Sequence, residues 1–207
     1  MKQIDLTYIN KSEESDNISV IILQKNYAAA IDEFAVAWKV IKNCGYGMYH
    51  PFSYSLDLEL NAVDSYGNHM SRVTAEPGQQ FQVANFGRST LLRYKGPAWS
   101  PVEIELANNL PKGAISANVY RSGQLVVTKT SMPPGQKAVF VLKPIIFIGT
   151  VSQVVREGEI ITSAVISQAN TELSLTGIKS ASIVMTGGGS GPNSTPYKFD
   201  LQDIVST

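Results

Sequence analysis

The two residues of this chain that come nearest to a chemical site are Cys44 and His50, both in the segment NCGYGMYHPF. A thiol and an imidazole can act together as nucleophile and base, or as two ligands of a metal ion. A zinc site needs three or four ligands, and the spacing of these residues fits no such pattern. We therefore expect Cys44 to be a small buried residue and His50 to sit at the turn before Pro51.

Other motifs that carry chemistry are incomplete. The glycine-rich segment 186–196 (TGGGSGPNSTP) lacks the lysine of a phosphate loop, and its two prolines exclude an immediate helix, so we expect an exposed loop. The Gly-X-Ser-X-Gly motif of serine hydrolases does not occur. Asp64 with Asn61 and Asn68 has too few carboxylates for a calcium loop. We expect no catalytic residue, no metal site and no cofactor, and a protein that is not an enzyme.

Aromatic residues in predicted loops are the stronger candidates for binding. Four of them cluster around the 43–52 loop and Trp99 lies between two prolines in KGPAWSP. Exposed aromatic rings stack on sugars, insert at membrane interfaces or anchor protein contacts; the alternative is that they pack against the ends of their own sheet. The residues predicted to bind a ligand are Tyr46, Tyr49, His50, Phe52 and Trp99.

The sequence predicts that the elements which position these residues are β-strands. Apolar and polar residues alternate in Gln3–Ile9, Tyr54–Val63 and Tyr197–Ile204, as in half-buried strands. The region 31–41 favours a strand from Phe34, with a short helix in Ala28–Glu33 as the alternative. Further predicted strands are Ile18–Leu23, His69–Thr74, Gln79–Asn85, Leu91–Tyr94, Val102–Leu106, Ile145–Val151, Glu159–Ser167 and Ala181–Met185. For Asn170–Leu175 the alternatives are a strand and a helical turn.

The stretch 114–143 predicts three strands in succession, Ala114–Tyr120, Leu125–Thr130 and Gln136–Leu142, which we interpret as a meander at the centre of the fold. A Pro-Gly-Gln sequence stands before a predicted strand at Pro77 and again at Pro134, with a looser copy at Glu157-Gly158-Glu159. Proline followed by glycine is typical of a type II turn. The repetition indicates strand-turn-strand construction.

Many short strands separated by turns, with little helix, predict an all-β fold: an antiparallel β-sandwich or jelly-roll-like body, with two similar β halves as a variant. A single domain over residues 1–207 is the expected organisation, with 108–113 as a weaker alternative boundary.

Composition limits the partners. The 207 residues include 17 basic and 17 acidic side chains, and charged residues make up only 16%. Without excess positive charge we expect no nucleic-acid binding, and a weakly charged surface self-associates easily. The single cysteine excludes an internal disulfide. The N-terminus shows no signal-peptide core and no run is long enough to span a bilayer, so we expect a soluble, cytoplasmic protein, with leaderless release as an alternative.

Three hypotheses for function follow. The first is a non-enzymatic β-sandwich that acts through its surface as a self-assembling, structural homo-oligomer, with Gln3–Ile9 and Tyr197–Ile204 as strand edges open to pairing. The second is a binding module for a glycan or a membrane lipid, lectin-like or cytolysin-like, that uses the loop aromatics. The third is an enzyme centred on Cys44 and His50, whose activity Cys44→Ala would abolish.

Overall fold

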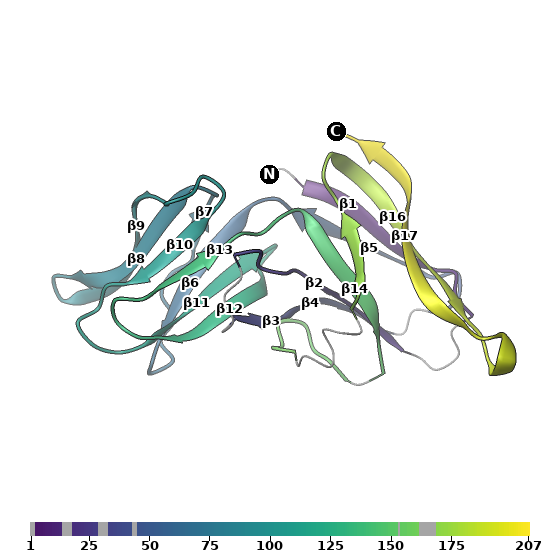
Figure 1. Cartoon of the computed structure of the whole chain (residues 1–207), viewed down its shortest axis with the longest axis horizontal. Coiled ribbons are helices and arrows are strands. Elements are labelled where there is room, and N and C mark those ends of the chain that lie inside the picture. Colours follow the sequence, from purple (N-terminus) through teal and green to yellow (C-terminus); the bar gives the residue numbers. More distant parts are fainter. Residues whose placement is uncertain (1–2, 14–17, 29–32, 43–44, 153, 162–168) are drawn as a thin grey trace. The chain divides into compact units, whose positions relative to one another are not determined.

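A computed structural model of the chain describes residues 3–13, 18–28, 33–42, 45–152, 154–161 and 169–207 (Figure 1). The fold is all-β and sandwich-like, with four mostly antiparallel sheets. The only helix among these residues is a 3-10 turn at Gly191–Asn193. In the described part of the chain, no helix has the length and apolar character that crossing a membrane requires.

The chain divides into two compact units. Unit 1 comprises Met1–Gln24, Ala35–Leu56 and Pro144–Thr207, and unit 2 comprises Lys25–Phe34 and Asp57–Lys143. The alternative boundary at 108–113 lies inside unit 2. That the whole chain behaves as one domain stays a prediction.

Unit 1 contains two four-stranded sheets. The first has the order β17-β16-β1-β5 and the second the order β15-β14-β2-β4. The strands of the first sheet are β1 (Gln3–Asn10), β5 (Tyr49–Ser55), β16 (Ile178–Gly188) and β17 (Thr195–Ser206). Those of the second are β2 (Ser19–Leu23), β4 (Ala37–Ile41), β14 (Ile145–Val151) and β15 (Thr171–Ser174).

Unit 2 contains a four-stranded sheet of order β13-β10-β8-β9 and a five-stranded sheet of order β3-β12-β11-β6-β7. The strands of the first are β8 (Gln79–Phe86), β9 (Ser89–Pro97), β10 (Ile104–Asn108) and β13 (Lys137–Phe140). Those of the second are β3 (Glu33–Ala35), β6 (Leu58–Asp64), β7 (Val73–Ala75), β11 (Ile115–Arg121) and β12 (Gln124–Met132).

The two units share a sheet plan. Each has one sheet with a parallel pair at its centre and antiparallel strands on both sides: β1 with β16 in unit 1, and β8 with β10 in unit 2. In the other sheet of each unit the neighbouring strands are antiparallel: β15, β14, β2 and β4 in unit 1, and β12, β11, β6 and β7 in unit 2. Within these two sheets the strands also have the same chain order, since β17-β16-β1-β5 and β13-β10-β8-β9 each place the fourth, third, first and second strand of the sheet side by side. The two units differ in the sequence in which the chain passes from one sheet to the other.

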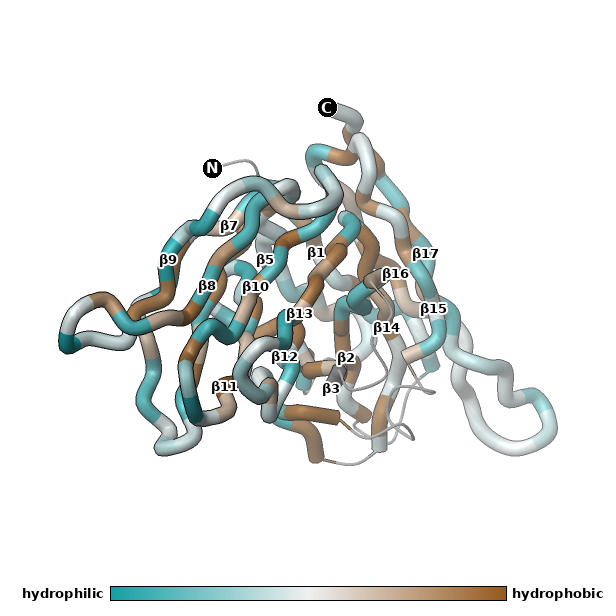
Figure 2. Tube along the Cα trace, turned by 60° about the vertical axis from the view of Figure 1, so that its left-hand side comes forward, coloured by the Kyte–Doolittle hydropathy of each residue, from teal (hydrophilic) through white to brown (hydrophobic). Residues whose placement is uncertain are grey.

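Buried apolar residues lie on the strands of both units, for example at alternate positions of β1. Figure 2 shows apolar residues in brown along the strands. In unit 1, Trp38 of β4 contacts Tyr54 of β5 edge to face, with ring centroids 5.6 Å apart, and so joins the two sheets. In unit 2, the Asn108 side chain donates to the carbonyl of Met132 at 2.9 Å and joins β10 to β12. Alternating burial of this kind is what keeps the strand register fixed.

The predicted Pro-Gly turns are confirmed. Gly78, Gly135 and Gly158 have φ values of 88°, 82° and 79°. The residue after each glycine donates its N–H to the carbonyl three positions earlier, at 3.1–3.2 Å. Positive φ at the third turn position is the geometry for which glycine is preferred, so the short sequence repeat marks a repeated turn.

Several predicted elements differ from the structure. The strand predicted over Tyr54–Val63 is interrupted between β5 and β6, and the return strand predicted at His69 begins at Val73. The central meander is only a hairpin, because β13 belongs to a different sheet from β11 and β12. A positive φ of 56° at Ser131 and the Gly135 turn redirect the chain there. Residues 29–32 of the helix alternative in Ala28–Glu33 and most of the strand predicted over Glu159–Ser167 fall outside the described residues, while Glu33 begins β3.

Candidate functional site

Two of the predicted aromatic residues are exposed where the chain enters β5: Tyr46 in the preceding loop and Tyr49 as the first residue of the strand. Tyr46 is 75% exposed and Tyr49 is 69% exposed. The loop backbone is anchored to the end of β1: Gly47 N–H donates to the Asn10 carbonyl at 2.7 Å, and Asn10 N–H donates to the Met48 carbonyl at 3.1 Å. The two tyrosines therefore project from a backbone held in place by hydrogen bonds.

Phe52 has a structural role in β5. Its ring lies 6.1 Å from that of Trp38 in an edge-to-face arrangement, and the Lys39 ammonium lies 5.5 Å from its centroid. Trp38 is buried and also contacts Tyr54, whose hydroxyl bonds to the Gln24 amide at 2.6 Å. These contacts correspond to the alternative interpretation, in which aromatic residues pack against their own sheets.

His50 lies opposite Tyr8 in the antiparallel pairing of β1 and β5. Its Nε2 atom is buried and has no hydrogen-bond partner among the described residues. Cys44 lies outside the described residues, so its pairing with His50 stays a prediction. The described part of the chain contains no group of three or more His, Cys, Asp or Glu side chains that could hold a metal ion.

Trp99 belongs to unit 2, whereas the other four predicted residues belong to unit 1. Its side chain is 91% exposed. The loop that carries it is fixed at both ends, because Ala98 N–H donates to the Gly78 carbonyl at 2.8 Å and Gly78 N–H donates to the Glu103 carbonyl at 2.7 Å. The tryptophan thus stands on an ordered loop.

A buried carboxylate accepts a hydrogen bond from the backbone of this loop. Glu105 on β10 is 1% exposed and accepts hydrogen bonds from Trp99 N–H at 3.4 Å, Gln80 Nε2 at 2.6 Å and Lys137 Nζ at 2.6 Å. Burial acts to raise the pKa of Glu105, but these hydrogen bonds and the positive charge of Lys137 outweigh it, and the pKa is lowered. Glu105 is therefore a satisfied structural anion, and sequence reasoning missed it because a strand glutamate is ordinarily exposed.

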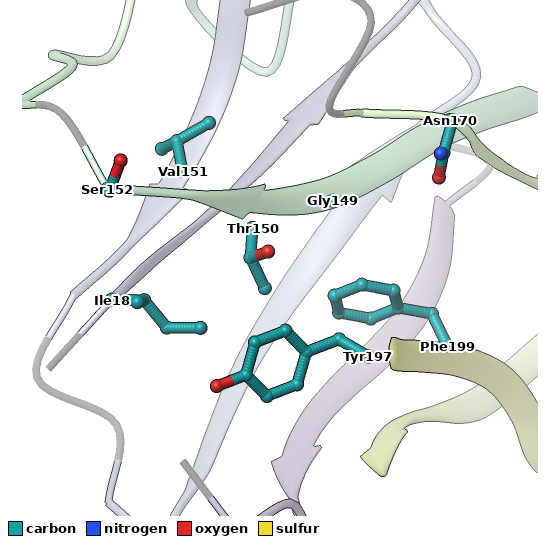
Figure 3. A pocket seen from close by; sticks show the side chains of 8 residues that line it. All are labelled: Ile18, Gly149, Thr150, Val151, Ser152, Asn170, Tyr197 and Phe199. Carbon is teal, nitrogen blue, oxygen red and sulfur yellow. The ribbon is translucent and has the colours of Figure 1, made fainter. Parts of the chain in front are cut away.

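A cavity of about 340 Å³ in unit 1 lies between β14 and β17 (Figure 3). The rings of Tyr197 and Phe199 lie in it, near Ile18 and Thr150 (Figure 3). Its eight lining residues include no histidine, carboxylate or amine. Among the described residues that line the cavity, the Tyr197 phenol is the only titratable group.

Two cavities of about 330 and 280 Å³ in unit 2 share Asp64 and Thr90. The Asp64 carboxylate accepts from the Asn68 side chain and from the N–H groups of Asn68 and Tyr66, each at 2.9 Å, and these bonds lower its pKa. Asn61 is buried and donates instead to the Met70 carbonyl. Asp64 thus holds a turn, and Asn61 is engaged elsewhere, so the geometry offers no support for a calcium site.

The glycine-rich segment is packed against Glu13. Glu13 N–H donates to the Gly187 carbonyl at 2.8 Å, and Gly189 N–H donates to the Glu13 carbonyl at 3.2 Å. An added Cβ at Gly187 would lie 2.2 Å from the Pro196 carbonyl oxygen. The glycines here allow close packing of backbone segments, and part of the predicted loop extends β16.

β17 offers an extended row of backbone groups at a sheet edge. It is 12 residues long, stands at the end of its sheet and pairs with β16 alone among the described strands. The prediction that Tyr197–Ile204 is an edge strand is confirmed. The same prediction for Gln3–Ile9 is wrong, because β1 lies between β16 and β5.

Comparison of the chain with protein-family models, with curated proteins and with solved structures finds no match.

Proposed function

We propose that this chain is a non-enzymatic β-sandwich protein that acts by assembling with copies of itself through the outer edge of β17. A strand edge carries unpaired N–H and C=O groups that a second strand can satisfy. The observation that carries the proposal is the length of β17, 12 residues, together with the lack of a pairing strand on its outer side in the described part of the chain.

Two other sheet edges, at β13 and at β4, are covered by the chain. Beside β13, the Asn26 side chain bonds to both Val139 and Val141 at 2.7–2.8 Å, and Tyr27 N–H donates to Val141 at 2.9 Å. Beside β4, Ala37 exchanges backbone hydrogen bonds with residues 158 and 159 at 2.8 and 3.0 Å. Proteins commonly cover or blunt exposed edges, and β17 stands out because it is long and carries no such cover among the described residues.

The surface of the chain also favours association. Its formal net charge is zero, so two copies repel each other weakly. Ile204 and Val205, near the end of β17, are 51% and 50% exposed. Association of two copies beside this end of β17 would remove part of this apolar area from water.

The test combines sizing with proline substitution. In an antiparallel strand, successive N–H groups point to opposite sides, so one of Asp200→Pro and Leu201→Pro removes an N–H that faces β16 and the other removes one at the open edge. We expect the wild type to form oligomers in light scattering, and the variant that keeps its unfolding temperature to be a monomer. A wild type that stays at 22.5 kDa at all concentrations would contradict the proposal.

A second function, binding of a glycan or a membrane lipid, is favoured by Trp99. An exposed tryptophan on an ordered loop can stack on a sugar or enter a membrane interface without a large loss of conformational entropy. Glycan-dependent thermal stabilisation would support a lectin, and liposome co-sedimentation would support a membrane-binding protein. Trp99→Ala should remove either effect, while Tyr94→Ala, at an aromatic residue that is 58% exposed on the same unit, should leave it intact.

A further inference from the structure

We propose that two copies pair β17 with β17 in antiparallel orientation, with Phe199 facing the partner's Phe199. This inference rests on the proposed function and names its partner and register. In such a pairing, Lys198 faces the partner's Asp200, Asp200 faces the partner's Lys198, and Tyr197 faces the partner's Leu201. The sequence YKFDL is therefore complementary to itself about its central residue.

The opposite charges that make this pairing favourable are those of Lys198 and Asp200. Lys198 and Asp200 are both exposed and stand on the same side of β17, because side chains two positions apart share a face. Neither forms an ion pair with another described residue. Their neighbours on β16 are the uncharged Thr186 and Val184. Opposite charges that face each other across antiparallel strands stabilise the pair, and like charges destabilise it.

Neighbouring registers are disfavoured. A dyad at Lys198 would place two lysines opposite each other, and a dyad at Asp200 would do the same with two aspartates. A shift by one residue would place the exposed Lys198 opposite the buried Phe199 of the partner, so that inward and outward faces would no longer match. Of these registers, the one centred on Phe199 sets opposite charges against each other and also matches the faces.

The regular part of the edge has clear limits. Pro196 has no N–H to offer at one end. At the other end, Asp203 has a φ of 50° and the pairing with β16 shifts there. Such irregularities end regular pairing. The remaining segment, Tyr197–Gln202, is centred close to Phe199.

The second-longest strand at a sheet end supplies a contrast. β9 has nine residues, and its exposed Arg93 and Lys95 flank Tyr94. The corresponding antiparallel self-pairing about Tyr94 would set Arg93 against the partner's Lys95, which is a like-charge pair. Of the two long edges, only β17 is self-complementary in charge.

The test uses two variants with opposite changes. Lys198→Asp makes both positions acidic, and Asp200→Lys makes both basic. Each variant alone should dimerise with a Kd at least about tenfold weaker than wild type, which corresponds to about 1.4 kcal/mol. An equimolar mixture should form a heterodimer, because every facing pair is then acidic against basic. Native mass spectrometry distinguishes the heterodimer by mass, and Lys95→Asp on β9 is the matched control, expected to dimerise like wild type.

The outcomes separate this register from the proposed function. If either variant alone dimerises as well as wild type, or if the mixture forms no heterodimer while the wild type dimerises, the register is wrong. If the edge-facing proline variant is then still a monomer, the β17 edge remains the interface in another register. A monomeric wild type would overturn both proposals. Unchanged thermal unfolding of the two variants, expected because both residues are exposed, shows that folding is not the cause.

Discussion

Glu105 and Lys137 are joined across β10 and β13 by a hydrogen-bonded ion pair of 2.6 Å between Oε1 and Nζ. The carboxylate is 1% exposed, while the lysine side chain is 46% exposed. The pair is not directly opposed in the strand register, since Lys137 faces Ala107. Lys137 therefore reaches diagonally along the sheet to compensate a charge that the fold has buried.

This pair predicts a loss of stability in acid. The pKa of Glu105 in the folded protein is below its ordinary value of about 4.5. A depressed carboxyl pKa contributes stability that is fully present above the unfolded value, and this contribution disappears as the pH falls below about 4.5 through the folded pKa. Urea unfolding between pH 7 and pH 3 should show the decrease, and Glu105→Gln should flatten it. An unchanged slope in Glu105→Gln would contradict this role.

Glu105→Gln should also weaken the folded state at neutral pH. The amide cannot accept at both of its positions, and Lys137 loses its counter-charge. We expect a cost of about 1–2 kcal/mol in unfolding free energy, because the lysine is half-exposed and water screens its charge. Glu103→Gln, two residues earlier and outside this network, is the matched control and should change the unfolding free energy little.

Close packing at Gly187 predicts a strong effect of adding one methyl group. Gly187→Ala would place Cβ 2.2 Å from the Pro196 carbonyl oxygen at a φ of 89°, and we expect a loss of about 2–4 kcal/mol. Gly177 has a similar φ of 73° with no atom within 4 Å of the added Cβ, so Gly177→Ala should cost only about 1 kcal/mol. Equal losses in the two variants, measured by chemical denaturation, would show that the contact with Pro196 is unimportant.

A buried polar row crosses three strands of unit 2. The Thr128 hydroxyl donates to the side-chain Oδ1 of Asn118 at 2.7 Å, and the Asn118 Nδ2 donates to Oδ1 of Asn61 at 3.4 Å. Asn118→Ala should cost about 1–3 kcal/mol because it leaves buried partners unsatisfied. Thr128→Val combined with Asn118→Ala should cost less than the sum of the two single changes. Strict additivity in this double-mutant cycle would rule out coupling within the row.

Substitution of the two tryptophans should change the unfolding free energy by very different amounts. Trp99→Ala, at a position 91% exposed, should change the unfolding free energy by less than about 0.5 kcal/mol. Trp38→Ala, at a position 3% exposed between Phe52 and Tyr54, should cost about 3–5 kcal/mol. In Trp38→Phe, the remaining fluorescence should be readily quenched by iodide. Protection of that emission from iodide would contradict the exposed position of Trp99.

Local patterns in the sequence predicted much of the strand content, because alternation and turn residues act over a few positions. Gln79–Asn85 and Ile145–Val151 lie within or match β8 and β14, and the Pro-Gly turns have the predicted φ values. The sequence patterns did not predict which distant segments pair with each other. Residues 3–10 alternate like an edge strand, yet β1 is central because β16, far along the chain, pairs in parallel with it.

Local sequence patterns predicted the candidate sites only in part. Exposure of Tyr46 and Trp99 is in keeping with their places in loops, whereas Tyr49 is exposed although it lies in β5 and not in the predicted loop. The contact of Phe52 with Trp38 depends on two strands of different sheets, which no short pattern reveals. Glu105 could have been noticed only as one of two glutamates that alternate with apolar residues, and that pattern predicts a solvated face.

The most direct test of the central claim is the molar mass of the wild-type protein in solution, measured by light scattering under reducing conditions over a wide range of concentration. The account predicts a concentration-dependent species of twice the 22.5 kDa monomer mass or larger. It also predicts that Lys198→Asp and Asp200→Lys each shift the mass towards the monomer and that mixing them reverses the shift. A mass of 22.5 kDa at every concentration would contradict assembly through β17.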